Sequence, residues 1–226
     1  MTITIIGHGY VGLVSACCFA DFGNDVYVIG HTDEKLKRLR NGDPIIYEPG
    51  LKELLEKNNK AGRLHFIKEY EKAVSQSDIV FITVGTPPKE NGDADLSTVF
   101  HVAGLIAPHL KKGFTVVSCK STVPVGTNIE IEKILHKLKP THAEIAVASC
   151  PEFLREGSAL NDTFFADRVV VGSASQKAID LLLKLHASVP GKKVVTDLAS
   201  AELIKYTSNS MLAVKISFAN LISFYC

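Results

Sequence analysis

The chain has 226 residues, 46% of them hydrophobic, and its 25 Lys and Arg against 24 Asp and Glu give a net charge of +1. This composition excludes a disordered or low-complexity chain, and the near-zero charge gives no electrostatic reason to expect a nucleic-acid or anionic-membrane partner. No secretory leader is visible, and no stretch reaches about 18 uncharged apolar residues, so we expect a cytoplasmic protein without a membrane span. Five cysteines without a Cys-x-x-Cys pair indicate neither a disulfide framework nor a metal site.

Strands and helices alternate along most of the chain. In chain order the patterns predict a strand at 2–6, a helix at 10–22, a strand at 26–29, helices at 33–40 and 51–58, a strand at 79–84, a helix at 96–110, a strand at 115–119, a helix at 124–138, a strand at 144–148, a short helix within 151–160, a strand at 168–171, a helix at 175–187 and a strand at 193–195. Repeated units of this length are typical of a mostly parallel sheet with helices on both faces. The sequence therefore predicts an α/β, Rossmann-like, doubly wound fold.

The pattern changes near residue 200 to one long helix that is apolar around most of its girth. Such a helix is normally covered by another domain or subunit, so its apolar strip favours a homodimer formed through residues 200–226. We therefore expect a dinucleotide-binding domain over 1–198 and the beginning of a central helical domain over 199–226. Because the chain stops inside this helix without a cap, we expect it to be part of a longer protein.

A glycine-rich loop follows the first predicted strand. Gly7, Gly9 and Gly12 form a Gly-x-Gly-x-x-Gly run, with Tyr10 and Val11 between the last two. In this pattern the first glycine allows a tight turn, the second lets the backbone approach a pyrophosphate, and the third lets the helix pack against the strand. Because the run lies between a strand and a helix, it predicts a dinucleotide site rather than an ordinary turn.

The end of the second strand lacks the acid that usually accepts the adenosine ribose hydroxyls of NAD, because Gly30 stands there. His31, Thr32 and Lys35 are suited to a 2′-phosphate instead, as found in NADP. Alternatively, Asp33 reaches back to the ribose, or NAD binds with lower affinity. We expect NAD, and the pattern leaves NADP open.

Further motifs follow in order: Tyr47-Glu48-Pro49-Gly50, Val84-Gly85-Thr86-Pro87, Lys120-Ser121-Thr122-Val123-Pro124, Pro151-Glu152-Phe153-Leu154-Arg155-Glu156-Gly157, Asp167-Arg168-Val169 and Glu202-Leu203-Ile204-Lys205-Tyr206 with Asn209. Together they resemble the nucleotide-sugar 6-dehydrogenases of the UDP-glucose/GDP-mannose dehydrogenase family, most closely those that act on UDP-glucose. The resemblance covers essentially the whole chain. It implies NAD-dependent, four-electron oxidation of the sugar C6 alcohol to a carboxylate, through an aldehyde and a cysteine-bound thioester, which would convert UDP-glucose to UDP-glucuronate.

The resemblance also implies roles for individual residues. Lys205 and Asn209 match the catalytic pair that stabilises developing oxyanions, although a lysine and an asparagine four apart are common on any helix surface. Glu152 matches the carboxylate assigned to thioester hydrolysis, helped by Thr122. The cofactor set then comprises Gly7, Gly9, Tyr10, Val11, Gly12, Gly30, Lys35, Thr86, Ser121, Thr122 and Glu156. The substrate set comprises Glu152, Phe153, Leu154, Arg155, Lys205 and Asn209.

The nucleophilic cysteine of the family lies in a Gly-Gly-Ser-Cys motif that these 226 residues do not contain. Cys150 stands directly before the Pro151 motif, where packing is the expected role, and Cys226 lacks the surrounding glycines. We therefore expect this chain alone to be inactive and to bind UDP-glucose weakly. The alternatives are a dehydrogenase of GDP-mannose or another nucleotide sugar, a non-catalytic dinucleotide-binding module, and another Rossmann oxidoreductase, against which the Pro151 and Lys205 motifs speak.

Overall fold

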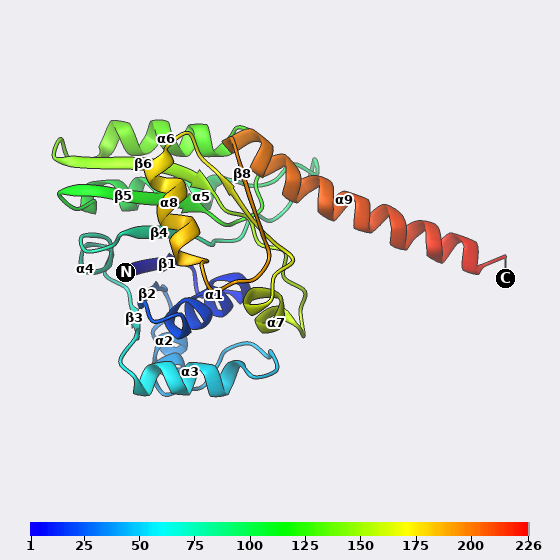
Figure 1. Ribbon diagram of the computed structural model, residues 1–226, viewed down its shortest axis with the longest axis horizontal. Coiled ribbons are helices and arrows are strands. Elements are labelled where there is room, and N and C mark those ends of the chain that lie inside the picture. The colour runs from blue at the N-terminus through cyan, green and yellow to red at the C-terminus, as the bar shows by residue number, and fades with distance from the viewer. Residues whose placement is uncertain (226) are drawn as a thin grey trace.

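The computed structural model describes residues 1–225, which form one eight-stranded sheet with helices on both sides (Figure 1). Every neighbouring pair of strands is parallel except β6 and β7. The sheet order is β3-β2-β1-β4-β5-β6-β7-β8, so the predicted doubly wound, mostly parallel fold is confirmed. The strands are β1 (Thr2–Ile6), β2 (Asp25–Ile29), β3 (Leu64–Ile67), β4 (Ile79–Ile82), β5 (Gly113–Cys119), β6 (Ala143–Ser149), β7 (Arg168–Gly172) and β8 (Lys192–Thr196).

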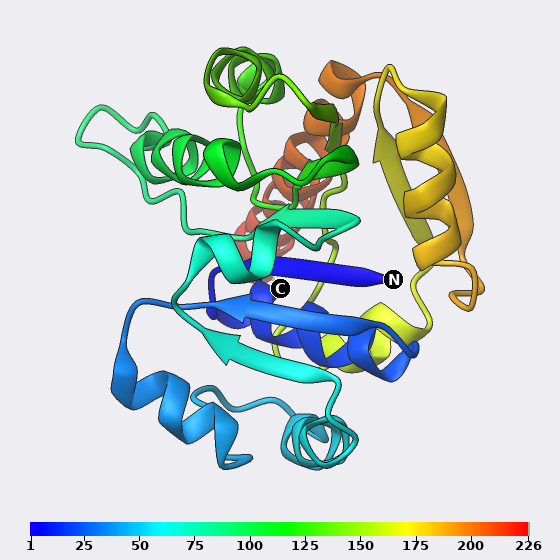
Figure 2. The same cartoon turned by 90° about the vertical axis from the view of Figure 1, so that its left-hand side faces the viewer.

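Helices cover the two faces of the sheet in separate groups, as Figure 2 shows from the side. Helices α1, α3 and α8 contribute to the core on one face, and α4, α5 and α6 to the core on the other. The helices are α1 (Tyr10–Asp21), α2 (Asp33–Arg40), α3 (Leu51–Lys60), α4 (Tyr70–Val74), α5 (Ser97–Ile106), the 3₁₀ helix η1 (Ala107–His109), α6 (Thr127–Leu138), α7 (Ala159–Phe164), α8 (Gln176–Leu185) and α9 (Leu198–Ser223).

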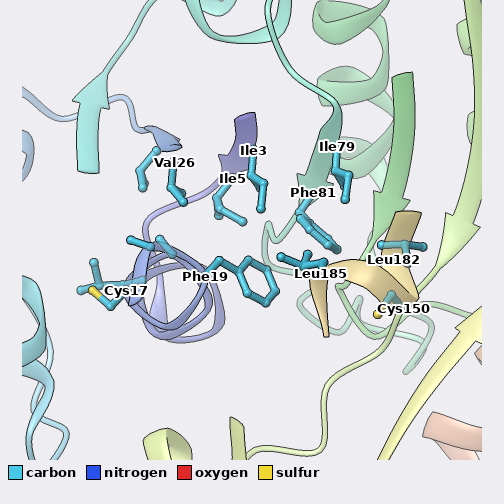
Figure 3. Packing of buried hydrophobic residues seen from close by; sticks show 14 of the residues in the cluster. Ile3, Ile5, Cys17, Phe19, Val26, Ile79, Phe81, Cys150, Leu182 and Leu185 are labelled. Carbon is cyan, nitrogen blue, oxygen red and sulfur yellow. The ribbon is translucent and has the colours of Figure 1, made fainter. Parts of the chain in front are cut away.

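The central strands are buried on both faces, which explains their continuous apolar sequences. Ile3 and Ile5 of β1 point to the face of α1, whereas Ile6 joins the opposite core. In Figure 3, Phe19 of α1 lies against Phe81 of β4, and the ring centroids are 5.3 Å apart. The packing therefore fixes α1 under β1 and β4, directly behind the glycine-rich loop.

Some predicted elements are wrong in detail. The predicted helix within 151–160 is a loop through Ser158, and the helix there is α7, which begins at Ala159. The helix predicted at 124–138 begins at Thr127, because Gly126 before it is left-handed, with φ 95°. The prediction also missed β3 and α4. Both are only four or five residues long and lie among charged side chains, so their patterns are weak.

Helix α9 leaves the body of the domain after its first turns (Figure 1). Ala201, Glu202 and Lys205 are buried, whereas the large apolar side chains from Met211 onward are exposed in the single chain. Among the described residues, no helix combines the length and the apolar content that a membrane crossing requires.

Cys17, Cys18, Cys119 and Cys150 are free thiols in the core, which confirms the packing role expected of Cys150. Burial raises the pKa of the Cys18 and Cys119 thiols to about 12 and raises that of Cys150. A buried thiol with a raised pKa is a poor nucleophile, which agrees with a structural role for Cys150. Cys226 lies outside the described residues.

The sheet order reverses between β1 and β4, since the chain runs outward through β2 and β3 and then returns to the other side of β1. In such sheets a crevice forms outside the carboxyl ends of the strands at this reversal, and ligands bind there. The loops after β1, β4 and β5 meet at this edge, and the glycine-rich loop is one of them.

Candidate functional site

The glycine-rich loop has the shape that a dinucleotide requires. Gly7 has φ 111°, and a Cβ there would lie 2.8 Å from the carbonyl oxygen of Thr83. A Cβ on Gly12 would lie 2.1 Å from the carbonyl oxygen of Gly7, so the close approach of α1 to the loop demands glycine. A Cβ on Gly9 would meet no atom within 4 Å, because Gly9 faces open space at the N-terminus of α1. The loop therefore offers a phosphate an open backbone and the positive end of a helix, which fits NAD.

The next two loops line the same edge and are tied to each other. Thr86 donates its hydroxyl to the carbonyl oxygen of Thr122 over 3.0 Å, and Ser121 donates to the carbonyl oxygen of Val84 over 2.7 Å. The structure thus brings Thr86, Ser121 and Thr122 together after β4 and β5. These contacts hold the two loops in fixed register beside the glycine-rich loop.

Lys205 and Glu152 form a largely buried ion pair. Lys205 Nζ lies 2.9 Å from Glu152 Oε1, and the side chains are only 7% and 12% exposed. The other carboxylate oxygen of Glu152 accepts the backbone N–H of Leu154 over 2.5 Å. The pair joins the loop after β6 to the first turns of α9, although the two positions are 53 residues apart in the sequence (205 − 152 = 53).

A pocket opens beside Lys205, which is one of its lining residues. Phe153 forms part of its wall, with the Arg168 guanidinium 4.1 Å and Lys205 Nζ 5.3 Å from the ring centroid. Asn209 is exposed on α9 and borders the same pocket as Lys205. The remaining lining residues are Leu154, Arg155, Asn161, Asp162, Phe165, Ala166, Asp167, Ser208 and Leu212. The predicted substrate residues from Phe153 to Arg155 therefore meet Lys205 and Asn209 in one place.

Glu152 and Glu156 differ in surroundings, contrary to the expectation that both lie on one short helix. Both belong to the loop before α7, in which Glu152 is turned inward to Lys205 and Glu156 is exposed. Arg155 is also exposed, and its guanidinium pairs with Asp162 of α7 over 2.6 Å. Neither glutamate lies on a helix, because α7 begins only at Ala159.

Glu48 connects the glycine-rich loop to the loop before α7, a role that the sequence did not reveal. Its carboxylate accepts the hydroxyl of Tyr10 and the backbone N–H groups of Gly157 and Ala159, the latter two over 2.8 Å each. Burial alone would raise the pKa of Glu48, but these hydrogen bonds outweigh it and hold the pKa below its usual value. Tyr10 comes directly after Gly9, so the hydrogen bonds of Glu48 tie the glycine-rich loop to the backbone around Gly157 and Ala159.

Glu202 is a second buried carboxylate that the analysis of the sequence missed. It accepts the backbone N–H groups of Gly126 and Asn128 over 2.7 and 2.8 Å, and the side-chain amide of Asn128 over 2.6 Å. A carboxylate at a helix N-terminus is stabilised by the helix dipole. Glu202 thereby anchors α9 to α6, which follows the loop of Ser121 and Thr122, and the anchoring places Lys205 one turn further along α9.

Gly30 and Lys35 lie at the end of β2 and on the exposed side of α2, where the ribose of a bound dinucleotide would lie. Asp33 is held in an ion pair with Lys68 after β3, with Asp33 Oδ2 and Lys68 Nζ 2.6 Å apart. Val11 lies in the first turn of α1, directly after Tyr10. Within residues 1–225, no group of three or more His, Cys, Asp or Glu side chains is placed to hold a metal ion.

The family models and the most similar curated proteins point to one family. Residues 1–190 match the NAD binding domain, and residues 199–226 the central domain, of the UDP-glucose/GDP-mannose dehydrogenase family. A UDP-glucose 6-dehydrogenase of Bacillus subtilis, YwqF, is 48% identical over the whole chain, which covers 51% of that protein. The UDP-glucose 6-dehydrogenase of Rhizobium meliloti is 45% identical, with 53% of it covered. The chain thus spans about half the length of the curated relatives it matches.

Two solved structures of nucleotide-sugar dehydrogenases have the same fold as this chain. A UDP-glucose dehydrogenase from Pyrobaculum islandicum superposes with a TM-score of 0.94 at 42% identity, covering 98% of this chain and 52% of that one. A GDP-mannose dehydrogenase from Pseudomonas aeruginosa superposes with a TM-score of 0.90 at 36% identity, covering 97% and 52%. A nucleotide-binding loop, an ion pair at the sheet edge and these matches lead to one conclusion: the chain belongs to the UDP-glucose/GDP-mannose dehydrogenase family.

Proposed function

We propose that this chain forms the dinucleotide-binding half of a UDP-glucose 6-dehydrogenase, which oxidises UDP-glucose to UDP-glucuronate with NAD. In this proposal, residues 1–198 bind the dinucleotide and residues 199–226 begin the central helical domain. The observation that carries the proposal is the buried Lys205–Glu152 ion pair. Its lysine lines a pocket together with Asn209, and its glutamate lies on the loop before α7, which Glu48 ties to the glycine-rich loop. The curated relatives at 41–48% identity are named for UDP-glucose, which supports this sugar over GDP-mannose.

The dinucleotide would be held by the residues at the carboxyl edge of the sheet. Gly7, Gly9 and Gly12 leave room for its pyrophosphate, and the N–H groups at the start of α1 bind it. Thr86, Ser121 and Thr122 lie on the other side of the crevice, where they would flank the rest of the cofactor, and Glu156 is exposed on the loop beside it. NAD, when bound, accepts a hydride from the sugar C6.

Lys205 and Asn209 would act on the sugar oxygen. Lys205 Nζ carries a positive charge in a largely dry site, where it stabilises an alkoxide or a tetrahedral oxyanion more than it would in water. Asn209, one turn further along α9, adds a side-chain N–H donor to the same pocket. Phe153, Leu154 and Arg155 form the adjoining wall, where their backbone would bind the nucleotide sugar.

Glu152 would take the proton of the water that hydrolyses a thioester, with Thr122 assisting it. Its Oε1 lies 2.9 Å from Lys205 Nζ, and this contact would hold the carboxylate in position to accept that proton. The thiol that forms the thioester must come from outside these 226 residues, because they contain no Gly-Gly-Ser-Cys motif. The proposal accordingly predicts no steady oxidation of UDP-glucose by this chain alone.

Titration calorimetry of the chain with NAD tests the proposed cofactor site. Replacing Gly9 with alanine should weaken NAD binding by about tenfold, or about 1.4 kcal/mol, because the added methyl group enters the space of the pyrophosphate. The fold should remain intact, since that methyl group meets no protein atom. Gly104→Ala on α5 is the matched control and should bind NAD as the parent chain does. Undetectable NAD binding by the parent chain, or equal binding by both variants, would refute the proposal.

A further inference from the structure

The end of β2 has no room for the acidic side chain that usually marks NAD binding. Gly30 is buried there, and a Cβ on it would lie 2.9 Å from His8 Nδ1 and 2.9 Å from Leu36 Cδ2. Leu36 belongs to the core of the domain and is fully buried. The ring of His8, the second residue of the glycine-rich loop, thus fills the position that an acid at residue 30 would take.

Basic side chains surround this position. His31 directly follows Gly30, and Lys35 lies on the first turns of α2; both are exposed. Burial lowers the pKa of His8, and charge repulsion from Lys35 and then from His31 lowers it further. Among the described residues, no ion pair is formed by His31 or Lys35.

The alternative partner for a ribose, Asp33, is engaged elsewhere. Its carboxylate lies 2.6 Å from Lys68 Nζ, on the side of β3. His8 Nε2, in contrast, is buried and has no hydrogen-bond partner within residues 1–225. A buried polar atom without a partner requires an explanation, and a ligand that supplies the partner is one.

We propose that the end of β2 binds the 2′-phosphate of NADP through His8, His31 and Lys35, so that NADP binds at least as tightly as NAD. An acid at residue 30 would repel this phosphate dianion, whereas basic side chains attract it, which is the usual difference between the two dinucleotide classes. The inference rests on the proposed function, because it requires the rest of the dinucleotide to bind at Gly7, Gly9 and Gly12. Gly30 and His8 then act together as specificity determinants.

Calorimetric titration of the chain with NAD and NADP at one salt concentration tests the inference. The dissociation constant of NADP should be equal to or lower than that of NAD, and adenosine 2′,5′-bisphosphate should bind more tightly than 5′-AMP. The double variant His31→Asn/Lys35→Gln should weaken the binding of NADP by about tenfold or more, which is the equivalent of one charge-assisted hydrogen bond. The binding of NAD should remain nearly unchanged. Lys37→Gln, a neighbouring exposed lysine on α2, is the control and should change neither.

Replacing both His8 and Gly30 tests whether the preference between the two dinucleotides can be reversed. His8→Ala/Gly30→Asp should favour NAD, whereas Gly30→Asp alone should weaken both dinucleotides, because His8 and Leu36 leave the aspartate no space. If NAD binds at least tenfold more tightly than NADP and the His31/Lys35 variant lowers both affinities alike, the inference is wrong and the proposed function stands. If neither dinucleotide binds, the proposed function itself fails, and the inference with it.

Discussion

Replacing Glu48 with glutamine should destabilise the domain by about 3 kcal/mol. The carboxylate accepts hydrogen bonds from Tyr10, Gly157 and Ala159, and a bond to a charged group contributes about 1 kcal/mol more than a neutral one. Glutamine keeps the shape of the Glu48 side chain but removes its negative charge. Its NH₂ group would also face one of these hydrogen-bond donors, which it cannot accept from. For a chain of this length, 3 kcal/mol lowers the midpoint of thermal unfolding by about 6–12 °C.

Urea unfolding followed by circular dichroism measures this change, with Glu53→Gln on the exposed side of α3 as the control. The pKa of Glu48 is lowered in the folded state, so its stabilising effect is present above the unfolded value of about 4.3 and is lost as the pH falls through the lowered pKa. The difference between parent and variant should therefore be full at pH 7 and shrink in strong acid. A loss below about 0.5 kcal/mol, or a loss equal to that of Glu53→Gln, would refute the role given to Glu48.

Other consequences concern stability and the proposed site. Burial, followed by repulsion from Lys120, lowers the pKa of His186 to about 4. Because the unfolded chain therefore takes up a proton first as the pH falls below about 6.5, the free energy of unfolding should drop by about 2 kcal/mol between pH 7 and pH 5. Urea unfolding of His186→Gln should show a flatter dependence on pH, and an unchanged pH dependence would contradict this explanation. Lys205→Met should lower the free energy of unfolding by about 3 kcal/mol, because it leaves Glu152 buried without a counter-ion. Adding Glu152→Gln should restore most of this loss. A double variant no more stable than Lys205→Met would show that the two charges are not coupled. Asn209→Ala, at an exposed position, should change the free energy of unfolding by less than about 0.5 kcal/mol.

Local sequence patterns were sufficient for the architecture and for the glycine-rich loop. The apolar runs of β1 and β4 and the glycine spacing act over a few residues, so their structure follows from neighbours in the chain. The predicted helix around Glu152 failed for the opposite reason. Its backbone is held by Glu48 and Asp162 rather than by helical bonds, and nothing in the local sequence records these contacts.

The links within the site were beyond local patterns. Glu48 was visible in its motif, but its partners Gly157 and Ala159 lie more than 100 residues away. Glu202 likewise precedes the recognised Lys205 by three residues, yet its partners belong to the start of α6. A carboxylate reveals its role only when folding brings backbone N–H groups to it, so such positions need the structure.

We propose that this chain supplies the dinucleotide site and the Lys205, Glu152 and Asn209 side chains of a UDP-glucose 6-dehydrogenase. The most direct measurement joins the chain to the C-terminal half of the Bacillus subtilis relative that is 48% identical to it and follows reduced cofactor with UDP-glucose. We expect two hydrides to be transferred per sugar, turnover to be lost in the Lys205→Met fusion, and the chain alone to show no steady turnover. A folded, dinucleotide-binding fusion that leaves UDP-glucose unoxidised, or a Lys205→Met fusion as active as its parent, would contradict it.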